Sequence, residues 1–356
     1  MKIYLKLFMI QKIKLKNFRN HEKYELDIEK PFIYIHGENG SGKTSILESI
    51  YFCATTKSHR TIDDKQMIQK DKPFAQVKLE ADQHQYEITI SKTGKRTFID
   101  GVEKRKLSEF VGHLSVVLFS PKDMDLISGS PSGRRQFMDL EMMQIDKKYL
   151  SQLNRYKKIL KQRNSLLKKI KIDDDYTFLN ILGDQLFEVG LELIKQRTVF
   201  VEEMNQYLTD VYKKISKHQI KMIYKPDVDE QSFKKHLKTH QKQEILYQTT
   251  LAGPHRDDLS FEFNGFEAKN YTSQGEQRLI VISLKLALLA WIENKTNRQV
   301  VLCLDDVLSE LDLDKQQILI ENLPKKHQII MNSAIPIEHS KIQSIELKKE
   351  ITYVKL

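Results

Sequence analysis

The sequence predicts an α/β fold, one domain of mixed β-sheets interrupted by a helical insertion, and three observations support this prediction. A strand, a glycine loop and a helix follow one another over Phe32–Ala54. Over Arg134–Leu246, Gly and Pro are scarce while Lys, Gln, Leu and Ile dominate, which indicates helices. Strand and helix patterns return over Leu259–Leu304. The predicted bounds are 1–130 and 247–356 for the two parts of the domain and 131–246 for a helical arm, a short coiled coil.

Several strands are predicted from short runs of alternating or buried apolar residues. Apolar residues alternate with lysines over Ile10–Phe18, a period of two that indicates a half-buried strand. The run Phe32–His36 is apolar and ends at a glycine, as does a buried strand that leads into a loop. Asp100-Gly101 is typical of a type I′ turn and indicates antiparallel hairpins around Val77–Ile99. The other predicted strands are Tyr24–Ile28, Ser115–Phe119, Leu259–Phe263 and Val300–Leu304, and Lys168–Asp175 is predicted to be a loop between helices.

Charge and hydropathy limit the class of protein. The 356 residues carry a net charge of +10, which favours a polyanionic partner. Cys53 and Cys303 lie far apart in apolar segments, so neither a disulfide framework nor a metal cluster is predicted, and a reducing cytoplasm fits. The opening ten residues are broken by lysines and predict no signal peptide. Leu279–Ile292 is too short to cross a bilayer and predicts a core helix within Gln274–Glu293, so we expect a cytoplasmic protein without membrane contact.

Residues 37–44 fit the P-loop pattern for phosphate binding in full. Glycines let the backbone fold around phosphates, so that successive N–H groups and the positive end of the following helix face the anion. We expect Lys43 to pair with the β and γ phosphates of ATP and to act in catalysis, and the hydroxyl of Thr44 to hold Mg²⁺. The expected nucleotide-binding residues of this loop are Gly37, Glu38, Asn39, Gly40, Ser41, Gly42, Lys43 and Thr44.

Two adjacent aspartates, Asp305 and Asp306, follow the apolar run Val300–Leu304 and supply the second acid that a P-loop site needs. We expect Asp305 to face the magnesium ion through a water molecule. Asp306 is expected where a general base orients the attacking water. Paired aspartates after an apolar run also mark a plain transition from strand to loop. Their presence in a chain with a P-loop favours the catalytic role for Asp306.

The segment Thr272–Gln277 precedes the long apolar helix, and Ser273 is suited to cap that helix with free N–H groups pointing outward. A plain helix cap would explain this segment taken alone. The order of segments along the chain favours a functional role beyond a helix cap. It runs from the P-loop through the insertion, the serine-glycine helix start and the apolar strand with paired acids to Ser309–Asp312. This order is typical of ABC-type ATPase heads, in which the serine-glycine motif of one subunit closes on the γ-phosphate held by the P-loop of another. We therefore expect Ser273, Gln274 and Gly275 to bind nucleotide.

Five segments in order resemble the RecF family, including stretches that other ABC-type heads lack. They are Leu15–Asn20, Lys57–Thr61, Ser130–Arg135, Gly253–Asp258 and Asp305–Asp312. The resemblance covers nearly the whole chain and implies an ATP-dependent DNA-binding homodimer with weak, DNA-stimulated ATPase activity. It also implies a role at single-strand/double-strand gaps in DNA, where the family works with recombination mediator proteins to load recombinase and supports replication, recombinational repair and the SOS response.

The chain departs from the family in two places. Met331–Ala334 stands where the family usually has a run of threonines. This argues against a switch-loop contact between Asn332, Ser333 or Ala334 and the γ-phosphate, and for slower hydrolysis. The family's start also matches Met9 better than Met1, which makes the first eight residues an extension or the product of a misplaced start codon.

Two alternative functions stay open: a component of an ATP-dependent nuclease, and an SMC-like structural protein that tethers DNA. The first needs a catalytic domain beyond Asp306, where only about fifty residues follow. The second needs a long heptad arm with a hinge or a paired-cysteine metal hook, whereas the insertion is about a hundred residues without cysteine. Candidates for DNA phosphate contacts are Arg60, Arg134, Arg135 and lysines of the arm, and His255 and Arg256 suit either nucleotide contacts or structural hydrogen bonds.

Overall fold

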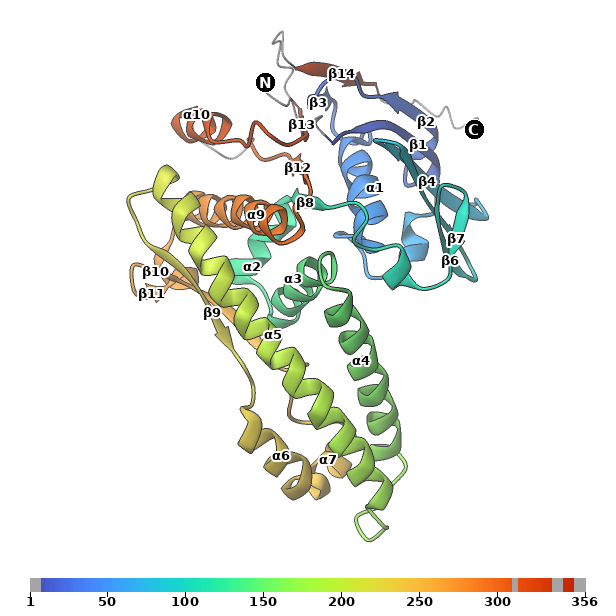
Figure 1. The fold of residues 1–356 in the computed structure, drawn as a ribbon, viewed down its shortest axis with the longest axis vertical. Helices are drawn as coiled ribbons and strands as arrows, with labels where there is room; N and C mark the ends of the chain where they lie inside the picture. Colours follow the sequence, from blue (N-terminus) through green and yellow to red (C-terminus); the bar gives the residue numbers. More distant parts are fainter. Residues whose placement is uncertain (1–7, 309–312, 335–341, 349–356) are drawn as a thin grey trace, which may run out of the picture. The chain divides into compact units, whose positions relative to one another are not determined.

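The computed structural model describes residues 8–308, 313–334 and 342–348, and the chain divides into two compact units. Unit 1 combines both ends of the chain, residues 1–124 and 274–356, and unit 2 is the continuous segment Asp125–Ser273 (Figure 1). Unit 2 is larger than the predicted arm of residues 131–246, because a strand beyond residue 246 pairs within it. Among the described residues, no helix is long and apolar enough to cross a membrane.

Six strands of unit 1 form an antiparallel sheet. They are β1 (Ile10–Phe18), β2 (His21–Asp27), β4 (Phe74–Ala81), β5 (His84–Ser91), β6 (Gly94–Ile99) and β7 (Val102–Lys104), in the order β2-β1-β4-β5-β6-β7. Buried and partly exposed residues alternate along β4, so one face of the sheet packs on the core. Asp100 and Gly101 both have a positive φ between β6 and β7, as a type I′ turn requires, and the predicted hairpins are confirmed.

A second sheet of unit 1 is parallel. Its strands are β3 (Phe32–Gly37), β8 (Val116–Phe119), β12 (Val301–Asp305), β13 (Ile329–Ser333) and β14 (Gln343–Leu347), in the order β14-β3-β13-β12-β8. Every residue of β8, β12 and β13 is buried, which explains why these strands are continuous apolar runs. Because the carboxyl ends of parallel strands meet at one edge of a sheet, the residues that follow β3, β12 and β13 come together there.

Two helices of unit 1 are buried around most of their circumference. α1 (Lys43–Thr55) contacts strands of both sheets and is buried beyond its first two residues. α9 (Gln274–Thr296) contacts β8 and is the predicted core helix. The charge of its buried Lys285 is compensated by Asp123, whose Oδ1 lies 3.0 Å from Lys285 Nζ. The other helices of unit 1 are η1 (Asp64–Met67), η2 (Leu107–Glu109), η3 (Pro121–Met124) and α10 (Leu313–Glu321).

Unit 2 is built around two long helices, α4 (Lys147–Leu167) and α5 (Thr177–Ile215), which pack side by side (Figure 1). The predicted loop lies between them. A three-stranded antiparallel sheet, β11-β10-β9, joins β9 (Ile220–Lys225), β10 (Asp258–Phe263) and β11 (Phe266–Glu267). The sequence indicates only helices where β9 lies, and it assigns β10 to the other unit, whereas the two strands pair. The shorter helices are α2 (Asp125–Ser128), α3 (Pro131–Met143), α6 (Glu230–Thr239), α7 (Gln241–Tyr247) and α8 (Ala268–Tyr271).

Candidate functional site

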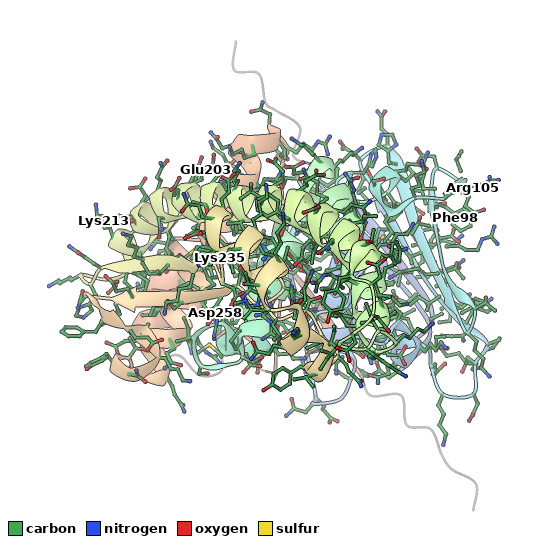
Figure 2. All side chains as sticks on the ribbon, turned by 90° about the horizontal axis from the view of Figure 1, so that it is seen from below. Phe98, Arg105, Glu203, Lys213, Lys235 and Asp258 are labelled. Atoms are coloured by element: carbon green, nitrogen blue, oxygen red, sulfur yellow. The ribbon has the colours of Figure 1, made fainter. Side chains whose placement is uncertain are left out.

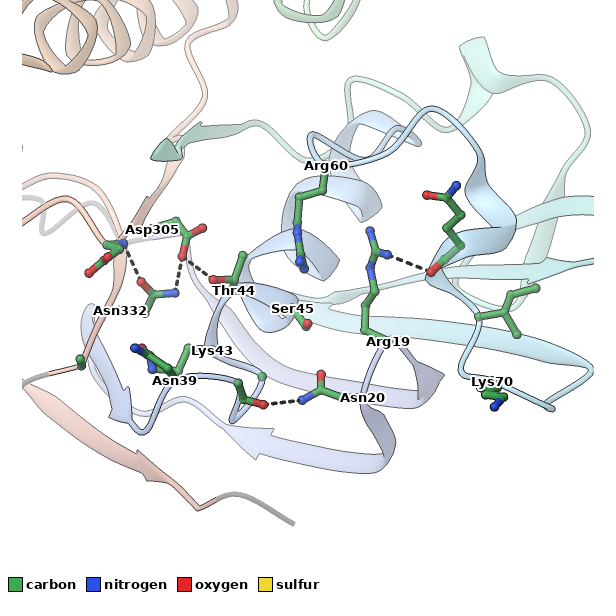
Figure 3. Close-up of a pocket in the computed structure, with 16 residues that line it drawn as sticks. Arg19, Asn20, Asn39, Lys43, Thr44, Ser45, Arg60, Lys70, Asp305 and Asn332 are labelled. Atoms are coloured by element: carbon green, nitrogen blue, oxygen red, sulfur yellow. Dashed lines mark hydrogen bonds between the residues drawn. The ribbon is translucent and has the colours of Figure 1, made fainter. Parts of the chain in front are cut away.

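A pocket of about 610 Å³ lies at the carboxyl edge of the parallel sheet in unit 1 (Figure 3). The P-loop follows β3, Asp305 ends β12 and Asp306 directly follows it, and Asn332 lies near the end of β13. The volume is within the range of small-molecule sites. The pocket is lined by Arg19, Asn20, Asn39, Gly40, Gly42, Lys43, Thr44, Ser45, Arg60, Gln66, Ile68, Lys70, Asp305, Asp306, Asn332 and Ala334.

The path of the P-loop depends on glycine at two positions. Gly37 and Gly42 have φ angles of 143° and 101°, in the region that side chains rarely adopt. A Cβ at Gly37 would lie 2.2 Å from the carbonyl oxygen of Leu347 on β14, and one at Gly42 would lie 2.4 Å from Nε2 of His21. Both approaches are shorter than any van der Waals contact. The backbone therefore comes close to its neighbours on both sides of the loop, which is the packing that the P-loop motif predicts.

Lys43 begins α1 and turns its ammonium group back into the loop. Its Nζ donates hydrogen bonds to the carbonyl oxygens of Gly37 at 2.7 Å and Glu38 at 2.9 Å. Partial burial lowers the pKa of Lys43, while Asp306 and Asp305 act in the opposite direction. A lysine held beside a glycine loop at the start of a helix supplies the positive charge that a polyphosphate group needs.

Thr44 and Asp305 meet although 261 residues separate them. Thr44 Oγ1 donates to Asp305 Oδ1 at 2.8 Å. Burial raises the pKa of Asp305, and the hydrogen bonds from Asn332 and Thr44 oppose that rise. A hydroxyl oxygen beside a carboxylate oxygen is the pair of hard donors that Mg²⁺ takes in nucleotide sites, with the remaining positions left to phosphate and water. The residues present therefore fit a magnesium ion.

Asn332 connects the two aspartates. Its Nδ2 donates to Asp305 Oδ1 at 2.6 Å, and its Oδ1 accepts the backbone N–H of Asp306 at 2.7 Å (Figure 3). Asp306 has a φ of 49°, a conformation that is uncommon outside glycine and that clusters at functional sites. The sequence singles out Met331–Ala334 only as a departure from the family, yet the structure places Asn332 directly between both acids.

Two further arginines line the pocket, and the motifs that contain them carry the resemblance described above. Arg19 comes from Leu15–Asn20 and Arg60 from Lys57–Thr61. Sequence reasoning assigns no role to Arg19 and makes Arg60 a candidate for DNA contact. In the structure, Arg60 lines this pocket and its Nη1 lies 3.2 Å from Oε2 of Glu48 on α1.

Some predicted nucleotide-binding residues do not line this pocket. Ser41 is buried in the P-loop, and its hydroxyl has no hydrogen-bond partner among the residues that the structure describes. Gln274 and Gly275 open α9 and are not lining residues, and Ser273, which directly precedes α9, is the last residue of unit 2. Ser309–Asp312 lies outside the described residues.

Arg134 and Arg135 are both engaged within unit 2. Nε and Nη2 of Arg134 donate to the two carboxylate oxygens of Asp258 at 2.7 and 2.9 Å, and the Arg134 side chain is only 10% exposed. Nη1 of Arg135 donates to the carbonyl oxygen of Asp257 at 2.7 Å. A bidentate pair occupies the guanidinium group of Arg134, and this disfavours Arg134 as a contact for DNA phosphates.

His255 and Arg256 make structural hydrogen bonds. The His255 ring contacts the Tyr156 hydroxyl through Nδ1 at 2.7 Å and the carbonyl oxygen of Thr250 through Nε2 at 3.1 Å. Arg256 Nη2 donates to the same carbonyl at 3.4 Å. Burial lowers the pKa of His255, which favours the neutral ring. Of the two roles that the sequence leaves open, these contacts support the structural one.

The sequence and the fold are both similar to those of known proteins. The sequence model of the RecF/RecN/SMC N-terminal domain matches residues 9–346. The chain is 53% identical over 342 residues to the DNA replication and repair protein RecF of Acholeplasma laidlawii (strain PG-8A). The aligned region covers 96% of this chain and 98% of that protein. It is 37% identical over 354 residues to the protein of the same name from Bacillus cereus (strain AH820), with 94% of each covered.

Solved structures of known proteins have a similar fold. The structure of the recombination mediator protein RecF-ATP in the RecFOR pathway has a TM-score of 0.88 and 29% sequence identity, with 96% of each chain covered. The Smc head domain of Pyrococcus furiosus has a TM-score of 0.52 at 17% identity, covering 92% of this chain and 90% of that one, and is similar in fold. The predicted fold class, an ABC-type ATPase head with a helical insertion, is confirmed.

Proposed function

The chain belongs to the RecF family of DNA replication and repair proteins, and from this premise we propose that it binds Mg²⁺-ATP in the pocket of unit 1 and uses it to bind DNA as a homodimer. In this proposal the protein works in the cytoplasm at single-strand/double-strand gaps and, with recombination mediator proteins, helps to load recombinase. Weak, DNA-stimulated ATP hydrolysis resets it. The names of the relatives and of the RecF-ATP structure support ATP and DNA repair as the general setting.

The observation that carries the ATP proposal is the convergence of distant segments on one pocket. Lys43 and Thr44 from the P-loop meet Asp305 and Asp306 at the end of β12, with Asn332 from β13 between the acids. Each side chain has a distinct chemical task in phosphoryl transfer. A plain strand-to-loop transition would not need a hydroxyl, two carboxylates, an amide and an ammonium group around the same 610 Å³.

The proposed roles follow from these positions. Lys43 and the backbone N–H groups of the loop bind the β and γ phosphates. Thr44 and Asp305 hold Mg²⁺, which neutralises charge on the phosphates when it is bound. Asp306 orients the attacking water and takes its proton, and Asn332 fixes the backbone N–H of Asp306 through the 2.7 Å hydrogen bond. These groups bind and orient the phosphates and leave the DNA contacts to other surfaces.

The dimer is proposed because the pocket has a cradle for phosphates but no residue of the serine-glycine motif. Gln274 and Gly275 are not lining residues, so we place the contact with the γ-phosphate on Ser273, Gln274 and Gly275 of a second copy. ATP then lies within the interface, and loss of the γ-phosphate weakens the dimer. α4 and α5 span 21 and 39 residues, which supports a short arm and disfavours a tether with long coiled coils.

Gel filtration with and without ATP, in the presence of duplex DNA, tests the proposal. We expect Lys43→Arg to stay monomeric, since a guanidinium does not fit the ammonium position inside the loop. Asp306→Asn is expected to bind ATP without hydrolysing it and to be trapped as a DNA-bound dimer. Lys92→Arg and Asp82→Asn are matched controls, because both residues are exposed and Asp82 has a φ of 58°, similar to that of Asp306. If both site variants behave alike whether or not ATP is present, the proposal fails.

A further inference from the structure

The exposed face of α4 is strongly basic. The helix contains seven Lys and Arg residues and no Asp or Glu. Lys147, Lys148, Arg155, Lys158 and Lys161 are exposed, and we name these five residues the α4 basic face. The two remaining basic residues differ from them: Lys157 pairs with Asp139 at 3.3 Å, and Arg163 is buried.

Helical geometry places these cations along one side of the helix. With 3.6 residues per turn, Lys147, Arg155, Lys158 and Lys161 fall within about 120° of the circumference. The exposed positions between them around the helix are Ser151, Asn154, Gln162 and Ser165. Two of these side chains end in amides and two in hydroxyls. Cations interspersed with short uncharged donors are the side chains that make phosphate contacts in protein–DNA complexes.

No acidic residue of the described chain lies within ion-pair distance of the charged groups of this face. Within the described part of the chain, the side chains of its five members make no ion pair or hydrogen bond, and only the backbone groups of Lys148 and Lys161 bond to other side chains. The neighbouring helix α5 differs, because it carries acidic residues as well as lysines; Glu203 and Lys213 extend from it (Figure 2). The positive charge of unit 2 is therefore concentrated on α4 and not spread evenly over both long helices.

The arrangement is unfavourable for the isolated helix. Lys147 and Lys148 lie in the first turn, where positive charge opposes the helix dipole, and only the side chain of Asp146 caps the free N–H groups there. Arg155 and Lys158 are three residues apart, as are Lys158 and Lys161, so like charges repel on adjacent turns. A polyanion lying along the helix would remove both penalties.

We propose that the α4 basic face contacts the phosphate backbone of duplex DNA. This inference rests on the proposed function, which makes DNA the partner, and it adds the surface of the protein that contacts the DNA. Lys147 and Lys161 are fourteen residues apart, or about 21 Å along the helix axis, long enough to pass several phosphates of one strand. Because four of its five members are lysines, which contact phosphates as point charges, we expect the face to bind DNA without reading its sequence.

The test compares two triple variants of the full chain with ATP present. Arg155→Gln, Lys158→Gln and Lys161→Gln together remove three charges from the α4 basic face. The control replaces three lysines of α6 and α7 with glutamine: Lys235, Lys238 and Lys242, which are exposed and similarly spaced. All six positions are at the surface, so both variants should fold, and circular dichroism and the ATP-dependent dimer check that they do.

The readout is the affinity for a duplex by fluorescence anisotropy at 50 and 200 mM salt. Each lost phosphate contact lowers the slope of log affinity against log salt by about 0.9, so the α4 variant should lose about 2.7 from its slope. Raising the salt should then weaken wild-type binding about fortyfold more than it weakens binding by the α4 variant. The control variant should keep the wild-type slope within about one contact.

Two results would overturn the inference while leaving the proposed function intact. One is an α4 variant with the wild-type affinity and slope, as expected if an acidic protein is the partner of this face. The other is an equal loss in both triple variants, which would indicate a general effect of net charge. A wild-type protein that binds no duplex with ATP, with ADP or without nucleotide would instead contradict the proposed function itself.

Discussion

Glu48 is a fully buried carboxylate that holds two arginines of the nucleotide pocket. It lies on α1 one turn after Thr44 and accepts hydrogen bonds from Nε of Arg19 at 2.8 Å and Nη1 of Arg60 at 3.2 Å. Burial alone would raise the pKa of Glu48, but Arg19, Ser58 and Arg60 outweigh it and hold the pKa below its usual value. One carboxylate thus positions two cations in the pocket beside the P-loop.

Replacing Glu48 with glutamine tests how much this positioning contributes to stability. Glu48→Gln removes the charge that compensates Arg19, whose side chain is only 17% exposed, and breaking a buried pair in this way typically costs about 3–5 kcal/mol. We expect a lower free energy of unfolding by urea at pH 7. Glu80→Gln is the control, because Glu80 pairs with Lys14 at the surface and its loss should cost less than about 1 kcal/mol. Equal losses in the two variants would contradict this assignment.

The same variants have an expected dependence on pH. A carboxylate whose pKa is lower in the folded state stabilises the protein above its unfolded pKa, and this contribution disappears as the pH falls through the folded pKa. Stability of the wild-type protein should therefore decline below about pH 4.5, and the decline should be smaller in Glu48→Gln. Urea unfolding between pH 3 and 7 measures it. An identical pH profile in both proteins would show that Glu48 is not the group responsible.

At the scale of elements, a buried ion pair joins α4 to the segment around α7. Arg163 and Glu244 both have fully buried side chains, and Arg163 Nη2 lies 2.6 Å from Glu244 Oε2. Arg163 Nη1 also donates to Thr250 Oγ1 at 2.9 Å. A buried pair contributes little net stability beyond what an apolar pair of similar size would give, but either partner alone is strongly destabilising.

A double-mutant cycle follows from this property. Arg163→Met alone leaves the Glu244 carboxylate buried without a counter-charge and should cost about 3–5 kcal/mol in the free energy of unfolding. Combining it with Glu244→Leu should recover most of that loss, since neither charge is then buried. Urea denaturation of the two single variants and the double variant measures the coupling. Losses that simply add would show that the two side chains do not depend on each other.

Elements with a local signal were predictable from the sequence. The P-loop is eight consecutive residues, and its flanking strand and helix follow the expected order. β9 has no comparable signal: Ile220–Lys225 is a short run between helices, and its partner β10 begins about thirty residues further along the chain. Pairing between distant segments stabilises such a strand, so the composition of the segment indicates only the helices around it.

In the nucleotide site too, residues in short sequence motifs were predictable, whereas residues brought in by the fold were not. Lys43, Thr44 and the paired aspartates belong to short motifs with fixed spacing, and the structure brings them into one pocket. Arg19 and Asn332 belong to segments that were compared with the family, but neither segment has a nucleotide-binding pattern of its own. Asn332 enters the site because β13 pairs with both β3 and β12, and Arg19 enters it because its neighbours Asn20 and His21 contact the carbonyl oxygens of Gly40 and Gly42 in the P-loop. Conversely, the sequence makes Arg134 a candidate for a phosphate contact but gives no sign that Asp258, 124 residues further along the chain, pairs with it.

At the scale of the whole molecule, the serine-glycine motif occupies the point where the chain passes between units. Ser273 is the last residue of unit 2, and Gln274 is the first residue of α9 in unit 1. The pocket itself is lined by residues of unit 1 alone. A second copy that contacts nucleotide through this motif would therefore act on the residues that connect its own two units. In the proposed dimer, ATP would thereby act on both units of the neighbouring copy.

A mixing experiment distinguishes a site shared between two copies from a site within one. Lys43→Ala removes the phosphate lysine, and Ser273→Arg blocks the serine-glycine motif, so each variant alone should lose DNA-stimulated ATPase activity. If the sites form between copies, a mixed dimer has one site with both defects and one intact site. Because about half of the dimers in an equal mixture are mixed, activity should return to about a quarter of the wild-type value. If each copy binds and closes on its own ATP, the mixture stays inactive, and a mixture that remains inactive although mixed dimers are detected by native mass spectrometry would exclude the shared site.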